Sequence, residues 1–113
     1  MTIIRIYQHE EGYANILKIV EYIKDEICKR NISDHIQFMD CPTYIEKNNK
    51  QYYCRELVFN DYKGKNKYNQ IKMNTDIIQK IIKVIASIRD ELYDLYNIEF
   101  YLEVETELKG IKI

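Results

Sequence analysis

Four glutamates recur near the end of the chain at a spacing that could support chemistry: Glu99, Glu103, Glu105 and Glu107. In an extended strand, side chains two residues apart share a face and lie about 6 to 7 Å apart. Carboxylates at that distance could bind a divalent cation or act as an acid–base pair. The same row could instead contact a protein partner, or be solvated and paired with lysines of a neighbouring strand. We therefore predict a partner-binding acidic strand made up of Glu99, Tyr101, Glu103, Glu105 and Glu107.

The middle of the chain offers a second candidate surface, because basic residues there are interleaved with tyrosines. Aromatic rings can stack on single-stranded bases while lysines and arginines contact the phosphates. However, residues 50–59 lack the glycine–aromatic alternation of an RNA recognition module. Tyrosine is also common at protein interfaces, so the eleven tyrosines of the chain fit a protein partner as well. The alternative hypothesis is a nucleic-acid-binding module in segment 44–72, using Lys50, Tyr52, Tyr53, Arg55, Lys63, Lys65, Lys67 and Tyr68.

Charge is distributed unevenly along the chain, although the net charge is only −1. Residues 90–107 contain seven acids and no base, whereas residues 46–72 contain seven bases and three acids. One explanation is external: the acidic segment faces a basic partner and the basic segment faces phosphates. The other is internal, with the two segments side by side and neutralising each other. The internal explanation would use Lys47, Lys50, Arg55 and Lys72.

The remaining reactive residues show no recognisable site spacing. A metal site would need His9, His35, Asp40 and Cys41 to converge, and their spacing matches no ligand motif. Three cysteines without paired spacing indicate free thiols. The chain has only three glycines, and it lacks a phosphate-binding loop and a serine nucleophile motif. We therefore predict no catalytic residue, metal or cofactor, although scattered site residues leave an enzyme open.

Two cations stand inside apolar helical stripes, Lys24 and Arg89. A charge buried there would be costly without a partner, so each is expected to reach solvent or an acidic neighbour. The alternative makes Arg89 the anion ligand of a small site between helix and sheet.

The acidic strand follows a long helix in the last third of the chain. Apolar residues recur every three to four positions from Asp76 to Tyr96, which predicts a helix with a wide buried side. After Asn97, which tolerates the left-handed conformation that ends many helices, the period changes to two. Residues 98–108 are expected to form one long strand with an apolar face and a glutamate face. Such a strand could extend past its neighbours and leave an edge for a homodimer.

The earlier part of the chain is expected to supply the rest of a sheet. Proline cannot donate to a strand ladder, so Pro42 is expected to end a strand. Asn48 and Asn49 accept the positive φ of a tight hairpin turn. The expected elements are a strand at 2–7, a helix at 13–30, a short strand at 34–40, a hairpin at 43–47 and 50–59, and a short strand at 70–73.

This order predicts an α+β fold, an antiparallel sheet with two helices packed on one face, in a single domain spanning 1–113. A ferredoxin-like (split βαβ) arrangement with an extra hairpin arm fits, and a different antiparallel sheet competes with it. Without a signal peptide or membrane span, the chain is expected to be cytoplasmic and not to bind membranes. Its isoleucine-, lysine- and asparagine-rich composition suggests a low-GC bacterium or phage. We expect a non-catalytic inhibitor, immunity-type or accessory factor that acts through protein contact.

Overall fold

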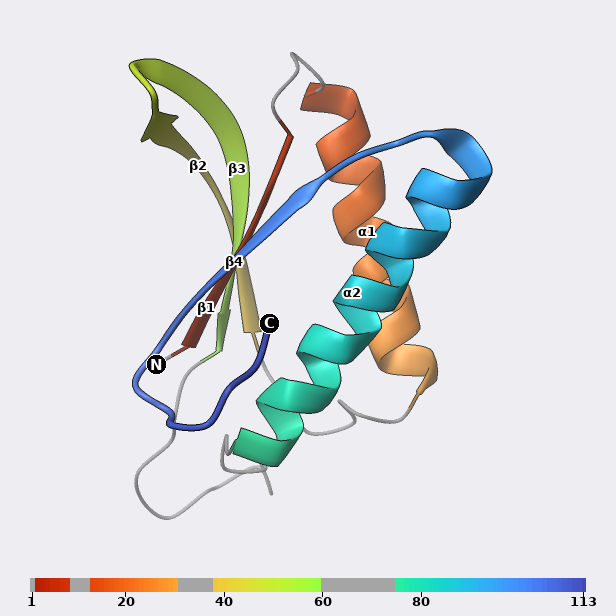
Figure 1. Ribbon diagram of the computed structural model, residues 1–113, viewed down its shortest axis with the longest axis vertical. Helices are drawn as coiled ribbons and strands as arrows, with labels where there is room; N and C mark the ends of the chain where they lie inside the picture. The colour runs from red at the N-terminus through yellow and green to blue at the C-terminus, as the bar shows by residue number, and fades with distance from the viewer. Residues whose placement is uncertain (1, 9–12, 31–37, 60–74) are drawn as a thin grey trace.

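The structure, a computed structural model, describes residues 2–8, 13–30, 38–59 and 75–113 (Figure 1). These residues form four strands and two helices in the order strand, helix, strand, strand, helix, strand. The elements are β1 (Thr2–Tyr7), α1 (Tyr13–Lys29), β2 (Phe38–Lys47), β3 (Lys50–Phe59), α2 (Thr75–Tyr96) and β4 (Tyr101–Thr106).

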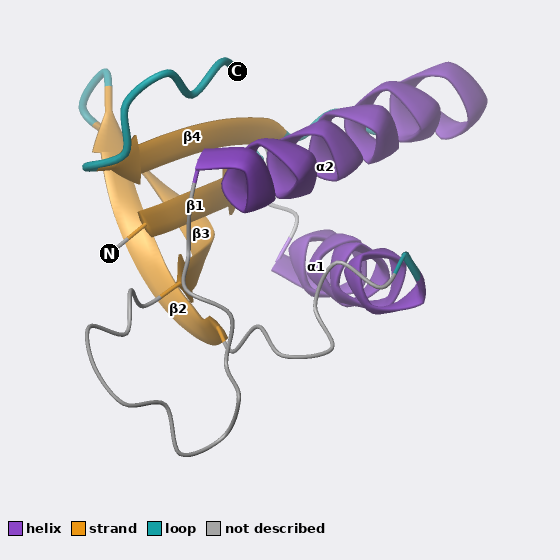
Figure 2. Ribbon diagram, turned by 90° about the horizontal axis from the view of Figure 1, so that it is seen from below, coloured by secondary structure: helices purple, strands orange, loops and turns teal. Residues whose placement is uncertain are grey.

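The four strands form one sheet with the order β2-β3-β1-β4, and every neighbouring pair is antiparallel. Both helices lie on the same side of this sheet (Figure 2). The predicted α+β class, with an antiparallel sheet and two helices on one face, is therefore confirmed. The ferredoxin-like assignment claims more than this and stays a prediction.

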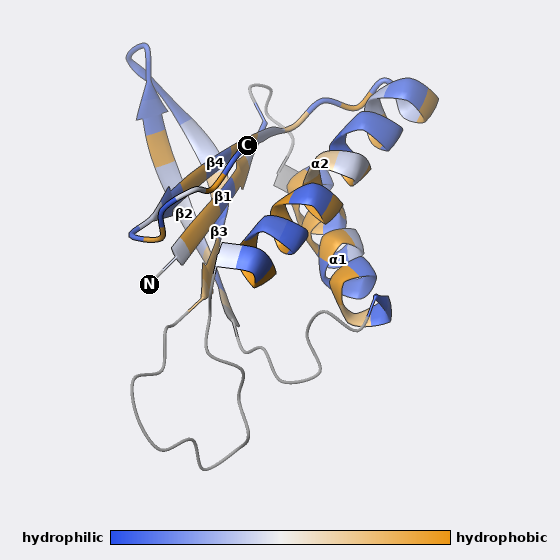
Figure 3. Cartoon of the chain, turned by 60° about the horizontal axis from the view of Figure 1, so that its bottom comes forward, coloured by the Kyte–Doolittle hydropathy of each residue, from blue (hydrophilic) through white to orange (hydrophobic). Residues whose placement is uncertain are grey.

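Alternation along the strands separates the two faces of the sheet. Ile4 pairs with Leu57 on one side and Val104 on the other, and these residues face the helices. Arg5 pairs with Glu56 and Glu103, which lie on the face without helices, called here the open face. Each helix is hydrophobic along the side that packs and hydrophilic along the other (Figure 3). The core is formed by buried residues of both layers, including Ile4, Ile6, Leu57, Phe59, Phe100, Ile16, Ile23, Ile27, Ile78, Ile81, Ile85 and Ile88.

The expected strand break at Pro42 is wrong. β2 runs without interruption through Pro42, which pairs with Arg55 of β3. The reason is position, because β2 is an edge strand and a proline there can turn the side without an N–H outward. The supposed extra hairpin arm is the second half of β2, and the described part of the sheet has no additional arm. β3 lies inside the sheet, as the apolar residues on both its faces suggested.

The last strand is shorter than expected. The period-two pattern extends over 98–108, but β4 covers only six residues, Tyr101–Thr106. Its sole strand neighbour, β1, also has six residues, and the two pair over their full lengths from Thr2↔Thr106 to Tyr7↔Tyr101. β4 therefore does not extend past its neighbour, so the overhang proposed as a dimer edge is absent. β4 is nevertheless the edge of the sheet.

Asparagines shape the turns as expected. Asn48 and Asn49 have φ values of 52° and 63° in the β2–β3 hairpin, and Asn97 has a φ of 54° directly after α2. The apolar pattern failed only at the end of α2, where Leu95 is 64% and Tyr96 66% exposed. The cause is that α2 extends past the sheet at its C-terminal end (Figure 2).

Several expected features lie outside the described residues: the strand start at 34–37, the loop and short strand between 61 and 73, and both histidines. None of the helices in the described ranges is both long enough and apolar enough to cross a membrane.

Candidate functional site

The acidic strand is partly neutralised by a basic residue in the centre of the sheet. Arg5 projects from β1 onto the open face, where its Nε lies 2.7 Å from Glu56 and its Nη2 2.6 Å from Glu105. The hydrogen bond with Glu105 raises the pKa of Arg5, and the bond with Glu56 adds to this while burial opposes it. Arg5 therefore stays charged and offsets carboxylates from the strands on both sides of it.

A second base reaches the acidic strand from the far edge of the sheet. Lys47 stands at the end of β2, yet it forms an ion pair with Glu103 of β4 and lies 5.2 Å from the centre of the Tyr7 ring. The β2–β3 hairpin must bend over the open face to bring it there, and Figure 1 shows this curvature. The internal explanation for the charge asymmetry is thus confirmed for Lys47. It is wrong for Arg55, which lies on the opposite face.

Tyrosines fill the space under this bent hairpin. The Tyr7 ring is 95% buried, stacks on Tyr101 at 5.5 Å, and lies 6.3 Å from Tyr52. Its hydroxyl donates to Glu103 at 3.4 Å. These rings therefore contribute to packing of the open face, and Tyr52 and Tyr101 are not freely available as stacking platforms for bases.

A cleft of about 670 Å³ lies where the end of α2 faces the start of β4. It takes in side chains from both faces of β4, such as Leu102 and Glu103, so it runs along the outer edge of that strand. Four carboxylates and three tyrosines line it, against a single basic side chain. We call it the acidic cleft, and its lining residues are Tyr7, Arg89, Asp90, Tyr93, Asp94, Glu99, Phe100, Tyr101, Leu102 and Glu103.

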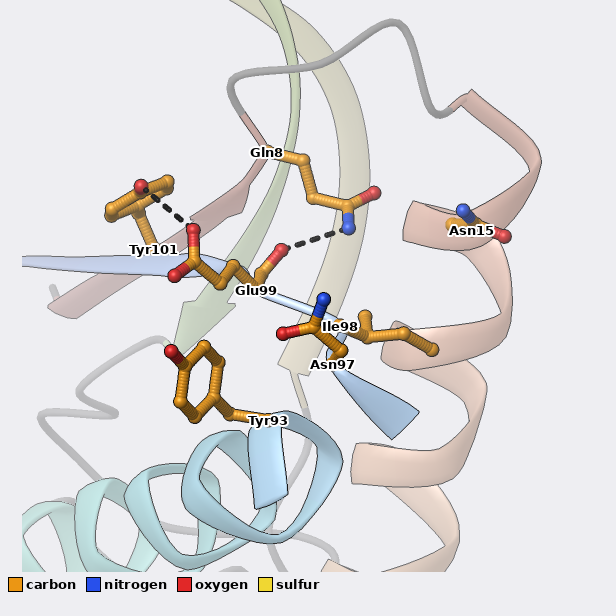
Figure 4. Close-up of a pocket in the computed structure, with 7 residues that line it drawn as sticks. All are labelled: Gln8, Asn15, Tyr93, Asn97, Ile98, Glu99 and Tyr101. Carbon is orange, nitrogen blue, oxygen red and sulfur yellow. Dashed lines mark hydrogen bonds between the residues drawn. The ribbon is translucent and has the colours of Figure 1, made fainter. Parts of the chain in front are cut away.

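A smaller pocket of about 360 Å³ adjoins the acidic cleft and shares Tyr93, Glu99 and Tyr101 with it (Figure 4). The amide of Gln8 donates to the backbone oxygen of Glu99 at 2.8 Å, and the Tyr101 hydroxyl lies 3.5 Å from the Glu99 carboxylate. The Gln8 bond ties the end of β1 to the segment before β4. It thereby positions Glu99 at the junction of the two hollows.

The carboxylates of the acidic cleft differ in how they are paired. Glu103 is bound by Lys47, and Asp90 has only a distant contact with Arg89 at 3.6 Å while remaining 71% exposed. Glu99 is exposed and has the Tyr101 hydroxyl beside it. Asp94 is exposed and forms no ion pair within the described part of the chain. The side of the cleft nearest α2 therefore retains uncompensated negative charge.

Arg89 is the one basic residue among those that line this cleft. It is 39% exposed and contacts an acidic neighbour, as the simpler expectation for this residue had it. The alternative, an anion site at Arg89, is opposed by the four carboxylates that line the same cleft. Glu107, the last member of the acidic strand, lies beyond the end of β4 and is exposed.

The β3 residues proposed to bind nucleic acid project from opposite faces of the sheet. Tyr52 points to the open face, whereas Tyr53 and Arg55 point to the helix side. Lys50 is exposed at the hairpin turn. The remaining candidates, Lys63, Lys65, Lys67 and Tyr68, lie outside the described residues.

Arg55 belongs to an ion cluster on the helix side. Asp40 accepts hydrogen bonds at 2.7 Å from both Nε and Nη2 of Arg55, and Nζ of Lys24 approaches it to 2.8 Å. Burial opposes ionisation, but the two cations outweigh it and lower the pKa of the Asp40 carboxyl. The hydrogen bond with Asp40 also raises the pKa of Lys24 and of Arg55. Lys24 therefore has the acidic neighbour that the sequence required, and the cluster joins α1 to the hairpin.

No group of three or more potential metal ligands converges within the described ranges. Asp40 is occupied by its two cations, and the next residue, Cys41, points to the other face. Burial raises the pKa of the Cys54 thiol to about 11, so this cysteine is protonated near neutral pH. Cys28 is exposed on α1, and none of the three cysteines forms a disulfide within the described ranges.

Sequence reasoning overlooked Arg5, Tyr7, Gln8, Tyr93 and Asp94 as site residues. One signal was available, because Arg5 stands between Ile4 and Ile6 and must therefore face away from the core. For Tyr93 and Asp94, no local pattern indicates that the end of α2 will face β4.

No protein-family model matches this chain, and no curated protein or solved structure matches it either.

Proposed function

We propose that this chain is a protein-binding domain that takes a basic segment of its partner into the acidic cleft. The observation that carries the proposal is the composition of the cleft, with four carboxylates, three tyrosines and one guanidinium around about 670 Å³. Carboxylates beside aromatic rings suit lysine and arginine. The cationic group of either side chain can pair with an acid and can also be attracted to the face of an aromatic ring. Complementary charge of this kind favours specific association.

The exposed end of α2 supports a protein partner. Tyr93 is 50% exposed and lies in the cleft, and Tyr96, three positions further along α2 and therefore next to it on the helix surface, is 66% exposed. Tyrosine is enriched at protein interfaces because its rigid ring buries a large area at little entropic cost. A partner seated in the cleft could cover these side chains as it pairs with Asp94 and Glu99.

Nucleic-acid binding by the segment 44–72 stays a prediction. On the open face, the basic residues Arg5 and Lys47 are both already paired with glutamates. A phosphate backbone lying there would meet those carboxylates, so the described surface favours a basic partner instead.

The proposal is tested with a seven-residue peptide of alternating lysine and threonine, labelled with a fluorophore and titrated at several salt concentrations. Micromolar binding that weakens with salt is expected, because exposed charges are screened. A matching glutamate–threonine peptide and a single-stranded oligonucleotide are expected not to bind. Preference for the oligonucleotide would overturn the proposal in favour of the nucleic-acid alternative.

Two double variants test whether the peptide binds in the cleft. Asp94→Asn/Glu99→Gln removes two cleft charges and is expected to reduce affinity for the lysine peptide about tenfold, or roughly 1.4 kcal/mol. Asp25→Asn/Glu91→Gln makes the same change in net charge at exposed positions outside the cleft, on α1 and α2. This control is expected to bind within about twofold of the unmodified protein. Equal losses in both variants would show that only overall charge matters.

A further inference from the structure

The outer edge of β4 faces no further strand in the described structure. β4 is the last strand of the sheet, and all its strand pairing is with β1. Within the described ranges, no backbone hydrogen bond outside the regular elements involves β4. Every second residue of an antiparallel strand points its N–H and C=O groups away from its neighbour. β4 therefore presents a row of backbone donors and acceptors at its outer edge.

The C-terminal segment runs beside part of this edge (Figure 2), but within the described ranges it forms no backbone hydrogen bond with β4. After β4 it turns back toward the start of α2 (Figure 1), where the Thr75 hydroxyl donates to the Lys109 carbonyl at 3.2 Å. The side-chain amide of Gln79 donates to the carbonyl of Lys112 at 2.7 Å and accepts from its N–H at 2.8 Å. The segment is thus held by α2, and the first residues of β4, Tyr101–Glu103, line the acidic cleft.

The acidic cleft follows this same edge. Leu102 is a half-buried apolar side chain on the helix side of β4, and Asp94 faces it from α2 across the cleft. An extended chain beside β4 would place alternate side chains in that space. A lysine there could lay its aliphatic stem on Leu102 and direct its ammonium group to Asp94.

A second copy of the chain is a poorer occupant. Pairing β4 with another β4 would bring Glu103 and Glu105 of the two copies together on the open face, and like charges side by side destabilise a sheet. Such a copy would also bring no base to Asp94 through its own β4, which carries no basic residue. Charge complementarity thus favours an extended basic segment.

We propose that β4 accepts an extended segment of a protein partner as a fifth strand, with every second residue basic and directed into the acidic cleft. This inference rests on the proposed function and adds how the partner binds. Main-chain hydrogen bonds supply affinity in such strand addition, and alternate side chains supply specificity.

N-methylation of the lysine–threonine peptide tests the proposal. One version carries N-methyl groups on all its lysines and the other on all its threonines. In a strand beside β4, only one of these two sets of amides faces the protein. One version is therefore expected to bind at least tenfold more weakly, because several hydrogen bonds are lost, while the other stays within about threefold of the unmodified peptide.

The outcomes separate the two proposals. If both methylated versions bind as the unmodified peptide does, or both weaken equally, strand addition is overturned while the basic-partner surface stands. If the unmodified peptide does not bind, both proposals are overturned. Light scattering is expected to show a monomer, and a dimer that dissociates as the peptide binds would identify a second copy as the occupant and overturn the partner chemistry.

Amide hydrogen exchange measured by NMR gives an independent reading. Alternate amides between Tyr101 and Thr106 are expected to gain protection when the unmodified peptide binds. Unchanged exchange throughout β4 in the saturated complex would contradict strand addition.

Discussion

Two regions of this small protein carry clusters of acidic residues, and they differ in what neutralises them. In the paired region, Arg5 binds Glu56 and Glu105, and Lys47 binds Glu103. At the end of α2, Asp94 forms no ion pair within the described chain, and Glu99 faces a hydroxyl rather than a base. Each region contains several carboxylates. What distinguishes a structural cluster from a candidate binding surface is therefore the supply of bases from neighbouring strands.

The half-buried ion cluster of Lys24, Asp40 and Arg55 on the helix side is also fully paired, and its disruption should have the largest effect. Asp40→Asn leaves Arg55, which is only 16% exposed, without its carboxylate, and leaves Lys24 with only its longer contact to Glu21 at 3.4 Å. Loss of one partner from a mostly buried pair is expected to lower the free energy of unfolding by about 3 kcal/mol at neutral pH. Urea unfolding measures this change. A decrease in the free energy of unfolding below about 0.5 kcal/mol would mean that the cluster does not stabilise the fold.

The same variant isolates a pH dependence. Because the pKa of Asp40 in the folded state is lowered from its ordinary value of 3.8, its stabilising effect is complete at about pH 5 and above, and it decreases as the pH falls through the ordinary pKa toward the lowered one. The stability difference between the unmodified protein and Asp40→Asn should therefore shrink from pH 5 toward pH 2, over about the range where the carboxyl is protonated. A difference that is constant over this range would contradict the assignment.

Arg5 tests the paired region itself, with a smaller expected effect. Arg5→Leu leaves the half-buried Glu56 and the exposed Glu105 without their cation, and should reduce the free energy of unfolding by about 2 kcal/mol. Adding Glu56→Gln should recover part of this loss, because one uncompensated charge is removed. If the double variant is no more stable than Arg5→Leu, the pairing with Glu56 contributes nothing measurable.

Asp94→Asn/Glu99→Gln should have the smallest effect on stability. Neither carboxylate has a cationic partner in the described structure, so the free energy of unfolding is expected to change by less than about 0.5 kcal/mol. A small gain is consistent with weaker repulsion among the acids of the cleft. A decrease in the free energy of unfolding above about 1 kcal/mol would mean that these two residues stabilise the fold.

Local patterns were sufficient to predict most of the fold. The periodicity of α2, the alternation after Asn97 and the Asn48-Asn49 turn each depend on neighbouring residues, and each appears in the structure. The errors arose where the outcome depends on distant segments. Pro42 is tolerated because β2 is an edge strand, and β4 is limited to Tyr101–Thr106, the six residues that pair with β1.

The candidate site was less predictable for the same reason. The acidic strand could be recognised from its spacing, but its pairing with Arg5 depends on strand order, which spacing does not reveal. Lys47 reaches Glu103 only because a hairpin bends across the sheet. The cleft itself exists because α2 extends past the sheet and faces β4, a tertiary feature without a local signal.

The most direct test compares one charge from each region. Asp94→Asn and Glu105→Gln each remove a single negative charge, and both affinity for the lysine–threonine peptide and stability in urea are measured for each. We expect Asp94→Asn to weaken binding about threefold to fivefold with stability unchanged, and Glu105→Gln to lower stability while affinity stays within about twofold. The reverse pattern, with binding lost in Glu105→Gln and retained in Asp94→Asn, would contradict the division between paired and binding acids.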